Sequence, residues 1–245
     1  MTETLHAQAQ TFAESLTRTV QAVVGPSCPP FIAVEIEAAS AFTVRQQPAE
    51  GIVLSSVEGP ILSLAVEYRC IHDGSDRYLA VEKSEIHVFV APGGRQPLFR
   101  YEYERSKSSK LPAAHIQFHG EHQELQKAMG ECGDSTPRAK RRKRGKSQVQ
   151  LSSLHFPVGG SRFRPTLEDI MDMLIEEFGV APAGSVRAAR ETLAESREAW
   201  RRSQIATVVR DAPSEAVRAL EELGYQVTSP TNGDAPDKPT KLRAL

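Results

Sequence analysis

Apolar residues recur at helical spacing at the start of the chain. Between Leu5 and Val23 they stand three or four positions apart, with glutamine, glutamate, threonine and arginine between them, which predicts an amphipathic helix over residues 3–24. From Phe31 to Ile36 the period changes to two, as expected for a strand that is buried on one face. We therefore expect the N-terminal helix to lead into a sheet.

Further runs with period two follow, and turn-forming residues such as Asp73-Gly74 separate them. No helical pattern interrupts the early runs, so we expect an antiparallel meander of six or seven strands between Phe31 and Pro157. The apolar positions of residues 78–90 change phase part-way. Because a period of two cannot shift without an extra residue, this change predicts a bulge near Lys83-Ser84.

Helical patterns return after the strands. Thr166–Phe178 carries a continuous apolar stripe, with Thr166 and Asp169 placed to form a capping box and Gly179 placed to end the helix. Residues 185–224 contain two further helical patterns that are more polar. From residue 228 to 245 the chain is rich in proline, aspartate, threonine and lysine, which predicts a disordered tail.

Together these patterns predict an α+β fold. It would comprise an N-terminal helix, an antiparallel β-meander, a helix at 166–178 packed on the sheet, and a helical C-terminal extension at 185–224. Residues 1–178 would form the α+β domain. Within it, residues 130–147 contain almost no apolar side chains, so we expect a mobile loop there.

The composition is that of a globular protein. Of 245 residues, 40% are hydrophobic and 25% are charged, and no run approaches the roughly 18 apolar residues of a membrane span. The N-terminus lacks the features of a signal peptide, and Cys28, Cys70 and Cys132 stand far apart without metal-ligand spacing. We therefore expect a soluble, cytoplasmic protein without a membrane partner.

Charge is distributed unevenly along the chain. The formal net charge is −1, but without the segment 138–146 the chain has 23 basic and 31 acidic residues, a charge of −8. The basic residues of this segment are Arg138, Lys140, Arg141, Arg142, Lys143, Arg144 and Lys146. Such a density of cations attracts RNA or DNA through counterion release. The alternatives are a solvated loop and a tether that folds back on the acidic remainder.

The histidines form the first candidate site. On a predicted strand at 115–119, His115 and His119 share one face but lie about 13 Å apart, too far to share one metal ion. The segment also lacks the glutamate of the H-E-x-x-H motif, so we expect neither a metal nor a cofactor. If this strand pairs with the strand predicted at 151–156, His155 could lie beside them. The three imidazoles are then either exposed polar residues of a one-sided sheet or a general acid-base site.

A second candidate site lies before the helix at 166–178. Gly159 and Gly160 permit a close backbone approach, Arg162 and Arg164 supply positive charge, and a helix N-terminus offers unpaired N–H groups. These residues, with Arg100 from an earlier strand, could hold a phosphate. The alternative is an ordinary glycine turn before a capped helix.

Three segments, in this order, resemble the TumE-type toxins of prokaryotic toxin-antitoxin loci. They are LFRYEY (Leu98–Tyr103), the strand at His115–His119 and RPTLEDIMDMLIEE (Arg164–Glu177), and the similarity covers about residues 60–178. This chain differs from that family in its long basic insertion and its extra helices at both ends. The resemblance implies a toxin-like or defence-related protein with a cognate antitoxin as its partner.

We therefore expect a cytoplasmic prokaryotic protein that interacts with nucleic acid and is a candidate RNA-directed enzyme. His115, His119 and His155 would carry out acid-base chemistry, and the arginines would hold phosphate. The alternative is a non-enzymatic interaction or defence-accessory protein whose sheet edge or C-terminal helices bind another protein. Convergence of the three histidines with Arg100 or Arg162 in one concave site would favour the enzyme.

Overall fold

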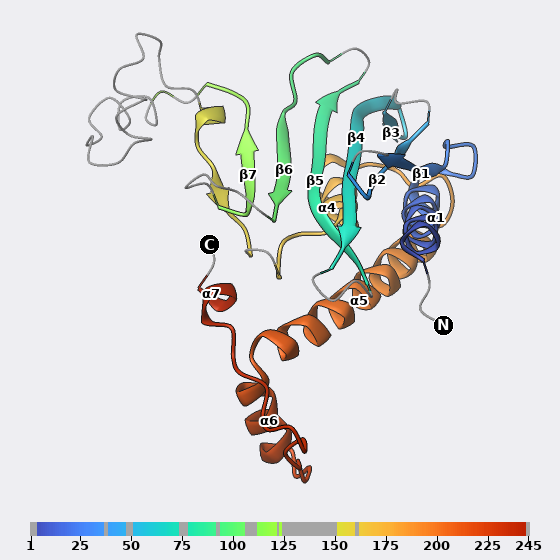
Figure 1. The fold of residues 1–245 in the computed structure, drawn as a ribbon. Coiled ribbons are helices and arrows are strands. Elements are labelled where there is room, and N and C mark those ends of the chain that lie inside the picture. Colours follow the sequence, from blue (N-terminus) through green and yellow to red (C-terminus); the bar gives the residue numbers. More distant parts are fainter. Residues whose placement is uncertain are drawn as a thin grey trace.

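A computed structural model describes residues 4–36, 39–47, 51–73, 78–91, 94–105, 112–121, 123, 151–159 and 162–243. It shows the expected α+β fold, in which an antiparallel sheet is covered on one face by helices (Figure 1). In chain order the elements are α1 (Leu5–Val24), β1 (Phe31–Ile36), β2 (Ala41–Gln46), β3 (Ile52–Ser56), β4 (Gly59–His72), β5 (Leu79–Val90), β6 (Phe99–Glu104), β7 (Ala114–Phe118), η1 (Leu151–Ser153), β8 (Phe156–Pro157), α4 (Leu167–Phe178), α5 (Val186–Asp211), α6 (Pro213–Glu222) and α7 (Pro239–Leu242).

The sheet has eight strands in the order β1-β2-β4-β5-β6-β7-β8, and β3 pairs with the first half of β4. All the pairs are antiparallel, which confirms the predicted meander. The register between β4 and β5 shifts so that Arg69 lies opposite Lys83 but Cys70 lies opposite Val81. Glu82 is therefore the extra residue, one position from the expected bulge. It lets both halves of β5 direct apolar side chains toward the helices.

The core lies between the sheet and the helices α1, α4 and α5 (Figure 1). Leu16 of α1, Leu64 of β4 and Leu174 of α4 are buried in one cluster. Ala189 and Leu193 of α5 belong to the same cluster. The first half of α5 is thus part of the domain core.

Three predictions about segments outside this core have different outcomes. The strand predicted at 151–156 is wrong, because the segment forms the short 3₁₀ helix η1 and only Phe156–Pro157 pairs with β7. The loop predicted at 130–147 lies outside the described residues. The predicted tail contains the short helix α7, and the Lys238 N–H just before it donates to the Asp211 carbonyl at 2.8 Å. Among the described residues, no helix has the length and apolar character needed to cross a membrane.

Candidate functional site

The face of the sheet opposite the helices carries two rows of polar side chains. Antiparallel pairing sets residues of neighbouring strands side by side, so each row crosses β5, β6 and β7. The first row is Glu85, Glu102 and His115, and the second is His87, Arg100 and Gln117. The two rows place carboxylates, imidazoles and a guanidinium side by side on this face.

His115 of β7 is fully enclosed on this face. Its side chain has no exposed surface; Nδ1 lies 3.1 Å from the Pro112 carbonyl oxygen and Nε2 lies 3.1 Å from Glu102 Oε2. Both partners can accept a hydrogen bond from the ring. Because it is fully enclosed, His115 is suited to orienting Glu102 rather than to touching a substrate.

Three neighbouring side chains stabilise the carboxylate of Glu102. Burial raises its pKa, but the imidazoles of His115 and His87 and the guanidinium of Arg100 lower it by more, so the pKa of Glu102 lies well below its usual range. Arg100 Nε lies 3.2 Å from Glu102 Oε1. Glu102 is therefore a carboxylate at every pH near neutrality, and it cannot serve as a general acid.

His155 joins this cluster from the segment after η1. Its ring stacks on His115, and its Nδ1 lies 2.5 Å from the amide nitrogen of Gln117. The Gln117 oxygen in turn accepts a hydrogen bond from Arg100 Nε at 2.5 Å. The structure thus brings together three of the predicted site residues, His115, His155 and Arg100.

His119 lies at the end of β7, where the Gln96 amide nitrogen is 3.2 Å from its Nδ1. Burial, together with the positive charges of Arg100 and His87, lowers the pKa of His119. The neutral imidazole is therefore favoured, as a general base requires. Its acid-base role, like those of His115 and His155, stays a prediction.

Arg162 and Arg164 do not join the histidines. Arg162 Nη2 forms an ion pair with Asp211 Oδ2 at 2.7 Å. The guanidinium carbon of Arg164 lies 3.8 Å from the ring centroid of Tyr103, on the helix side of the sheet. The predicted phosphate-binding residues are thus divided between two faces, with Arg100 on one and this pair on the other.

Gly159 begins the turn that leads to these arginines. Its φ is +69°, and a Cβ at this position would lie 2.1 Å from the Phe163 carbonyl oxygen. The Phe163 N–H donates to the Gly159 carbonyl at 2.9 Å. The glycine is therefore required by the turn itself. Gly160 and the basic residues 138–146 lie outside the described part of the chain, so their predicted roles stay predictions.

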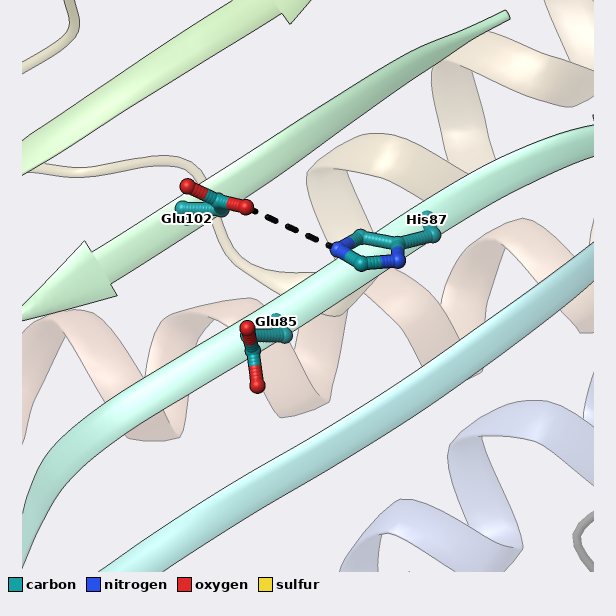
Figure 2. A group of neighbouring side chains, drawn as sticks. All are labelled: Glu85, His87 and Glu102. Carbon is teal, nitrogen blue, oxygen red and sulfur yellow. Dashed lines mark ion pairs between the residues drawn. The ribbon is translucent and has the colours of Figure 1, made fainter. Parts of the chain in front are cut away.

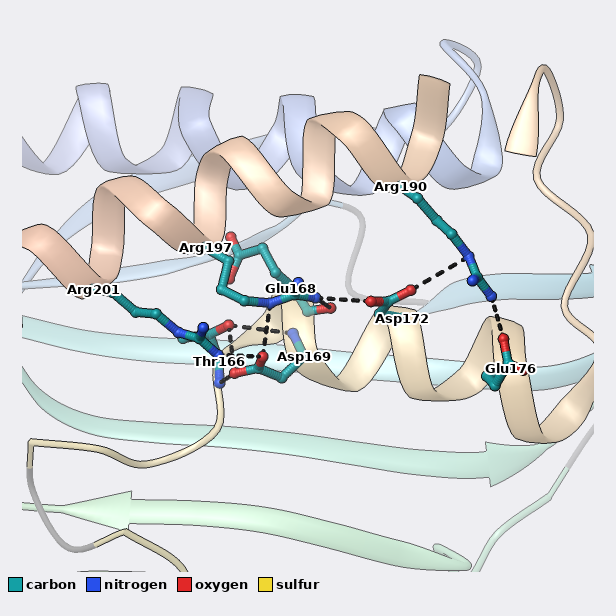
Figure 3. A network of polar contacts seen from close by, with 8 residues as sticks. All are labelled: Thr166, Glu168, Asp169, Asp172, Glu176, Arg190, Arg197 and Arg201. Carbon is teal, nitrogen blue, oxygen red and sulfur yellow. Dashed lines mark hydrogen bonds and ion pairs between the residues drawn. The ribbon is translucent and has the colours of Figure 1, made fainter. Parts of the chain in front are cut away.

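The N-terminus of α4 is already occupied by side chains of the protein. Thr166 and Asp169 form the predicted capping box, and Arg197 Nε of α5 lies 2.7 Å from Asp169 Oδ1 (Figure 3). Arg190 of α5 pairs with Asp172 and Glu176 further along the helix. A phosphate at this N-terminus would have to displace the Asp169 carboxylate. These ion pairs also direct two arginines of α5 toward α4.

A cavity of about 920 Å³ lies on the helix side of the sheet, and we refer to it as the groove. Its lining includes side chains of β5, β6, α5 and α7 and of the segment that leads to α4. The cationic residues that line it are Arg105, Arg162, Arg164, Arg210, Lys238 and Lys241, and the carboxylates are Asp73, Glu168 and Asp211. Aromatic residues Tyr78, Tyr103 and Trp200 also contribute. Sequence reasoning missed the groove because its residues come from segments more than 150 positions apart.

Sequence reasoning also missed Glu85, His87 and Glu102, whose ligand atoms all lie within 4.8 Å of one another. A signal was present, since the sequence Glu-Ile-His places two polar residues on one face of a strand. This signal could be recognised as part of a site only after the strand register showed that Glu102 lies directly opposite Glu85.

No family model matches the chain, and the searches of curated proteins and of solved structures found no significant match. The resemblance to TumE-type toxins therefore stays a prediction.

Proposed function

We propose that this protein binds single-stranded nucleic acid in the groove. The observation that carries the proposal is the charge of the lining, where six arginine and lysine residues accompany three carboxylates among the described residues. One of these carboxylates, Asp211, is paired with Arg162 and Lys238. The remaining excess of positive charge would attract a phosphate backbone.

The aromatic residues of the groove support a single strand rather than a duplex. Tyr78 is 51% exposed, and the guanidinium carbon of Arg210 lies 5.4 Å from its ring centroid. Trp200 lines the same cavity. An exposed ring such as that of Tyr78 can stack on a base, which contributes about 1–3 kcal/mol per base.

The toxin-like, RNA-directed activity belongs to the same proposal. Both sites use strand β6, since Tyr103 faces the groove and Glu102 faces the histidine cluster. RNA that leaves the groove past the edge strand β8 would reach His155, which is partly exposed. In this arrangement His155 and Arg100 would contact RNA, and the enclosed His115 would position them.

The experiment is a titration of fluorescently labelled RNA and DNA oligonucleotides at several salt concentrations. Arg210→Gln with Lys241→Gln should weaken binding and reduce the slope of log K against log salt by about 2, roughly one for each lost phosphate contact. Arg202→Gln is the matched control, since Arg202 lies on α5 and pairs with Glu198 at the surface.

A variant that lacks residues 138–146 distinguishes nucleic-acid binding by the groove from binding by the basic segment. If binding disappears in this deletion and is unchanged in the Arg210/Lys241 double variant, the groove is not the binding site. If RNA binds and single-stranded DNA does not, contacts to the 2′-hydroxyl are part of the recognition.

One observation favours a second candidate function, the binding of a protein partner such as an antitoxin. The second half of α5, and helix α6 beyond the end of the sheet, carry exposed apolar side chains (Figure 1). These are Ile205, Val209, Val217, Leu220 and Leu223. Co-expression with the product of the adjacent gene tests this function. A stable complex should form with the wild type and with the Arg210/Lys241 double variant, and Leu220→Glu should prevent it.

A further inference from the structure

A cluster of potential metal ligands lies on the open face of the sheet, away from the groove. Glu85 and His87 stand two residues apart on β5 and face the same side, and Glu102 lies directly opposite Glu85 on β6. One ligand atom from each residue lies within 4.8 Å of the other two (Figure 2). Donor atoms around one cation with bonds of about 2.0–2.2 Å are roughly 3–4 Å apart, so small side-chain rotations bring the three into range.

The imidazole of His87 points into this cluster with an unsatisfied nitrogen. Its Nε2 is buried and forms no hydrogen bond with any described residue. Glu102 Oε1 lies 3.7 Å away, which is too long for a hydrogen bond (Figure 2). A buried polar atom that makes no hydrogen bond is uncommon and requires an explanation. A metal ion between His87 and the two carboxylates would provide one.

The charges around the cluster also favour a cation. Glu67, Glu85 and Glu102 lie opposite one another across β4, β5 and β6. Like charges that face each other across strands destabilise a sheet. Lys83 and Arg100 offset part of this repulsion, since Lys83 Nζ lies 2.9 Å from Glu85 Oε2 and Arg100 Nε lies 3.2 Å from Glu102 Oε1. A divalent ion between Glu85 and Glu102 would neutralise more of it.

The neighbours of Glu102 orient its carboxylate for metal binding. His115 occupies Oε2, so Oε1 remains directed toward His87 and Arg100. Arg100 can leave Oε1 without losing all its contacts, since it also donates to Gln117. Hydrogen bonds from a buried residue commonly orient metal-binding carboxylates in this way.

We propose that Glu85, His87 and Glu102 bind one divalent first-row transition cation, with Zn²⁺ bound more tightly than Mn²⁺. One imidazole and two carboxylates provide the nitrogen and oxygen ligands that these ions accept, and affinity rises from manganese to zinc. Three protein ligands leave at least one coordination position for water. The side chains of His87 and Glu102 are 26% and 18% exposed, so water can reach that position. The site is independent of the groove, on the other face of the sheet.

The test is calorimetric titration of the full chain, stripped of metal with a chelator, with ZnCl₂ and with MnCl₂. We expect one zinc site in the wild type and its loss in both Glu85→Gln and His87→Gln. His6→Gln is the control, since His6 lies on α1 and stacks on Phe42. Circular dichroism of each variant checks that the fold is retained.

Two outcomes would overturn the proposal. One is that folded His87→Gln and Glu85→Gln bind the same number of zinc ions as the wild type. The other is a Co²⁺-loaded wild type whose only bound cobalt shows a thiolate charge-transfer band, because the proposed ligands contain no sulfur. If His87→Gln proves unfolded, Glu85→Gln and the cobalt spectrum still decide the matter.

Discussion

The imidazole rings of His115 and His155 lie almost parallel, with their centroids 4.6 Å apart and their planes inclined by 4°. His115 is fully buried, whereas His155 is partly exposed. His155 is therefore the member of the pair that a ligand can reach. The stack also attaches the segment after η1 to β7, where β8 contributes only two residues to the sheet.

The hydrogen bond between His115 and Glu102 should contribute measurably to stability. His115→Leu leaves the largely buried Glu102 carboxylate without this partner, so we expect the free energy of unfolding to fall by about 2 kcal/mol. In a double-mutant cycle with Glu102→Gln, urea unfolding should give a coupling energy of about 1–3 kcal/mol. His119→Leu is the control for losing an imidazole, since His119 directly follows β7. A coupling near zero would show that the pair contributes nothing.

The depressed pKa of Glu102 should make stability dependent on pH in acid. The folded pKa lies below the ordinary value of 4.5, so the stabilisation is present above about pH 4.5 and is lost as the pH falls through the folded pKa. Glu102→Gln lacks this contribution. Between pH 4.5 and 2, with chelator present, its thermal midpoint should fall less steeply than that of the wild type. Glu58→Gln, in the exposed turn before β4, should follow the wild type.

Replacing Gly159 should disturb the turn that leads to Arg162 and Arg164 of the groove. Gly159→Ala adds a Cβ that meets the Phe163 carbonyl oxygen and forces a strained positive φ, so we expect a loss of about 1–3 kcal/mol. The same experiment on Gly120→Ala should show little change, since no atom lies within 4 Å of that Cβ. Equal stabilities for the two variants, measured by urea unfolding, would contradict this account of the turn.

Cys70 should be inert in the folded protein. Burial raises the pKa of its thiol to about 12, and the side chain has no exposed surface. At neutral pH its thiolate fraction should be roughly a thousandfold below that of a free cysteine. A Cys28→Ser, Cys132→Ser variant retains Cys70 alone, and its reaction with Ellman's reagent should require unfolding. Rapid reaction of the native variant would place Cys70 at an accessible surface.

Local sequence patterns predicted most of the fold, because interactions between residues close in the sequence determine the ends of helices and the bulges of strands. The apolar stripe and the capping box of Thr166 and Asp169 set the start of α4 correctly. The phase change in β5 located its bulge to within one residue, at Glu82. The strand expected at 151–156 failed because alternation in a short segment does not guarantee a partner, and only two residues of β8 pair with β7.

The candidate sites depend on contacts between residues that strand pairing and turns bring together, and the sequence alone does not show these contacts. Placing His115 beside His155 required only that their segments be neighbours, so sequence reasoning could suggest it. Arg162 and Arg164 stand close to His155 in the sequence, yet the turn at Gly159 carries them to the other face of the sheet. Glu85 and His87 became a potential metal site only through the register with Glu102.

The polar rows on the open face also restrict how the central strands can align. If β6 slipped by one residue against β5, Arg100 and Glu102 would face the helices, and Phe99, Tyr101 and Tyr103 would face solvent. A carboxylate taken into an apolar core without partners costs several kcal/mol, in addition to the loss of aromatic burial. Both costs, the burial of a charge and the exposure of aromatic rings, therefore disfavour other alignments of these strands. The charged residues of the open face thus help to select a single native pairing during folding.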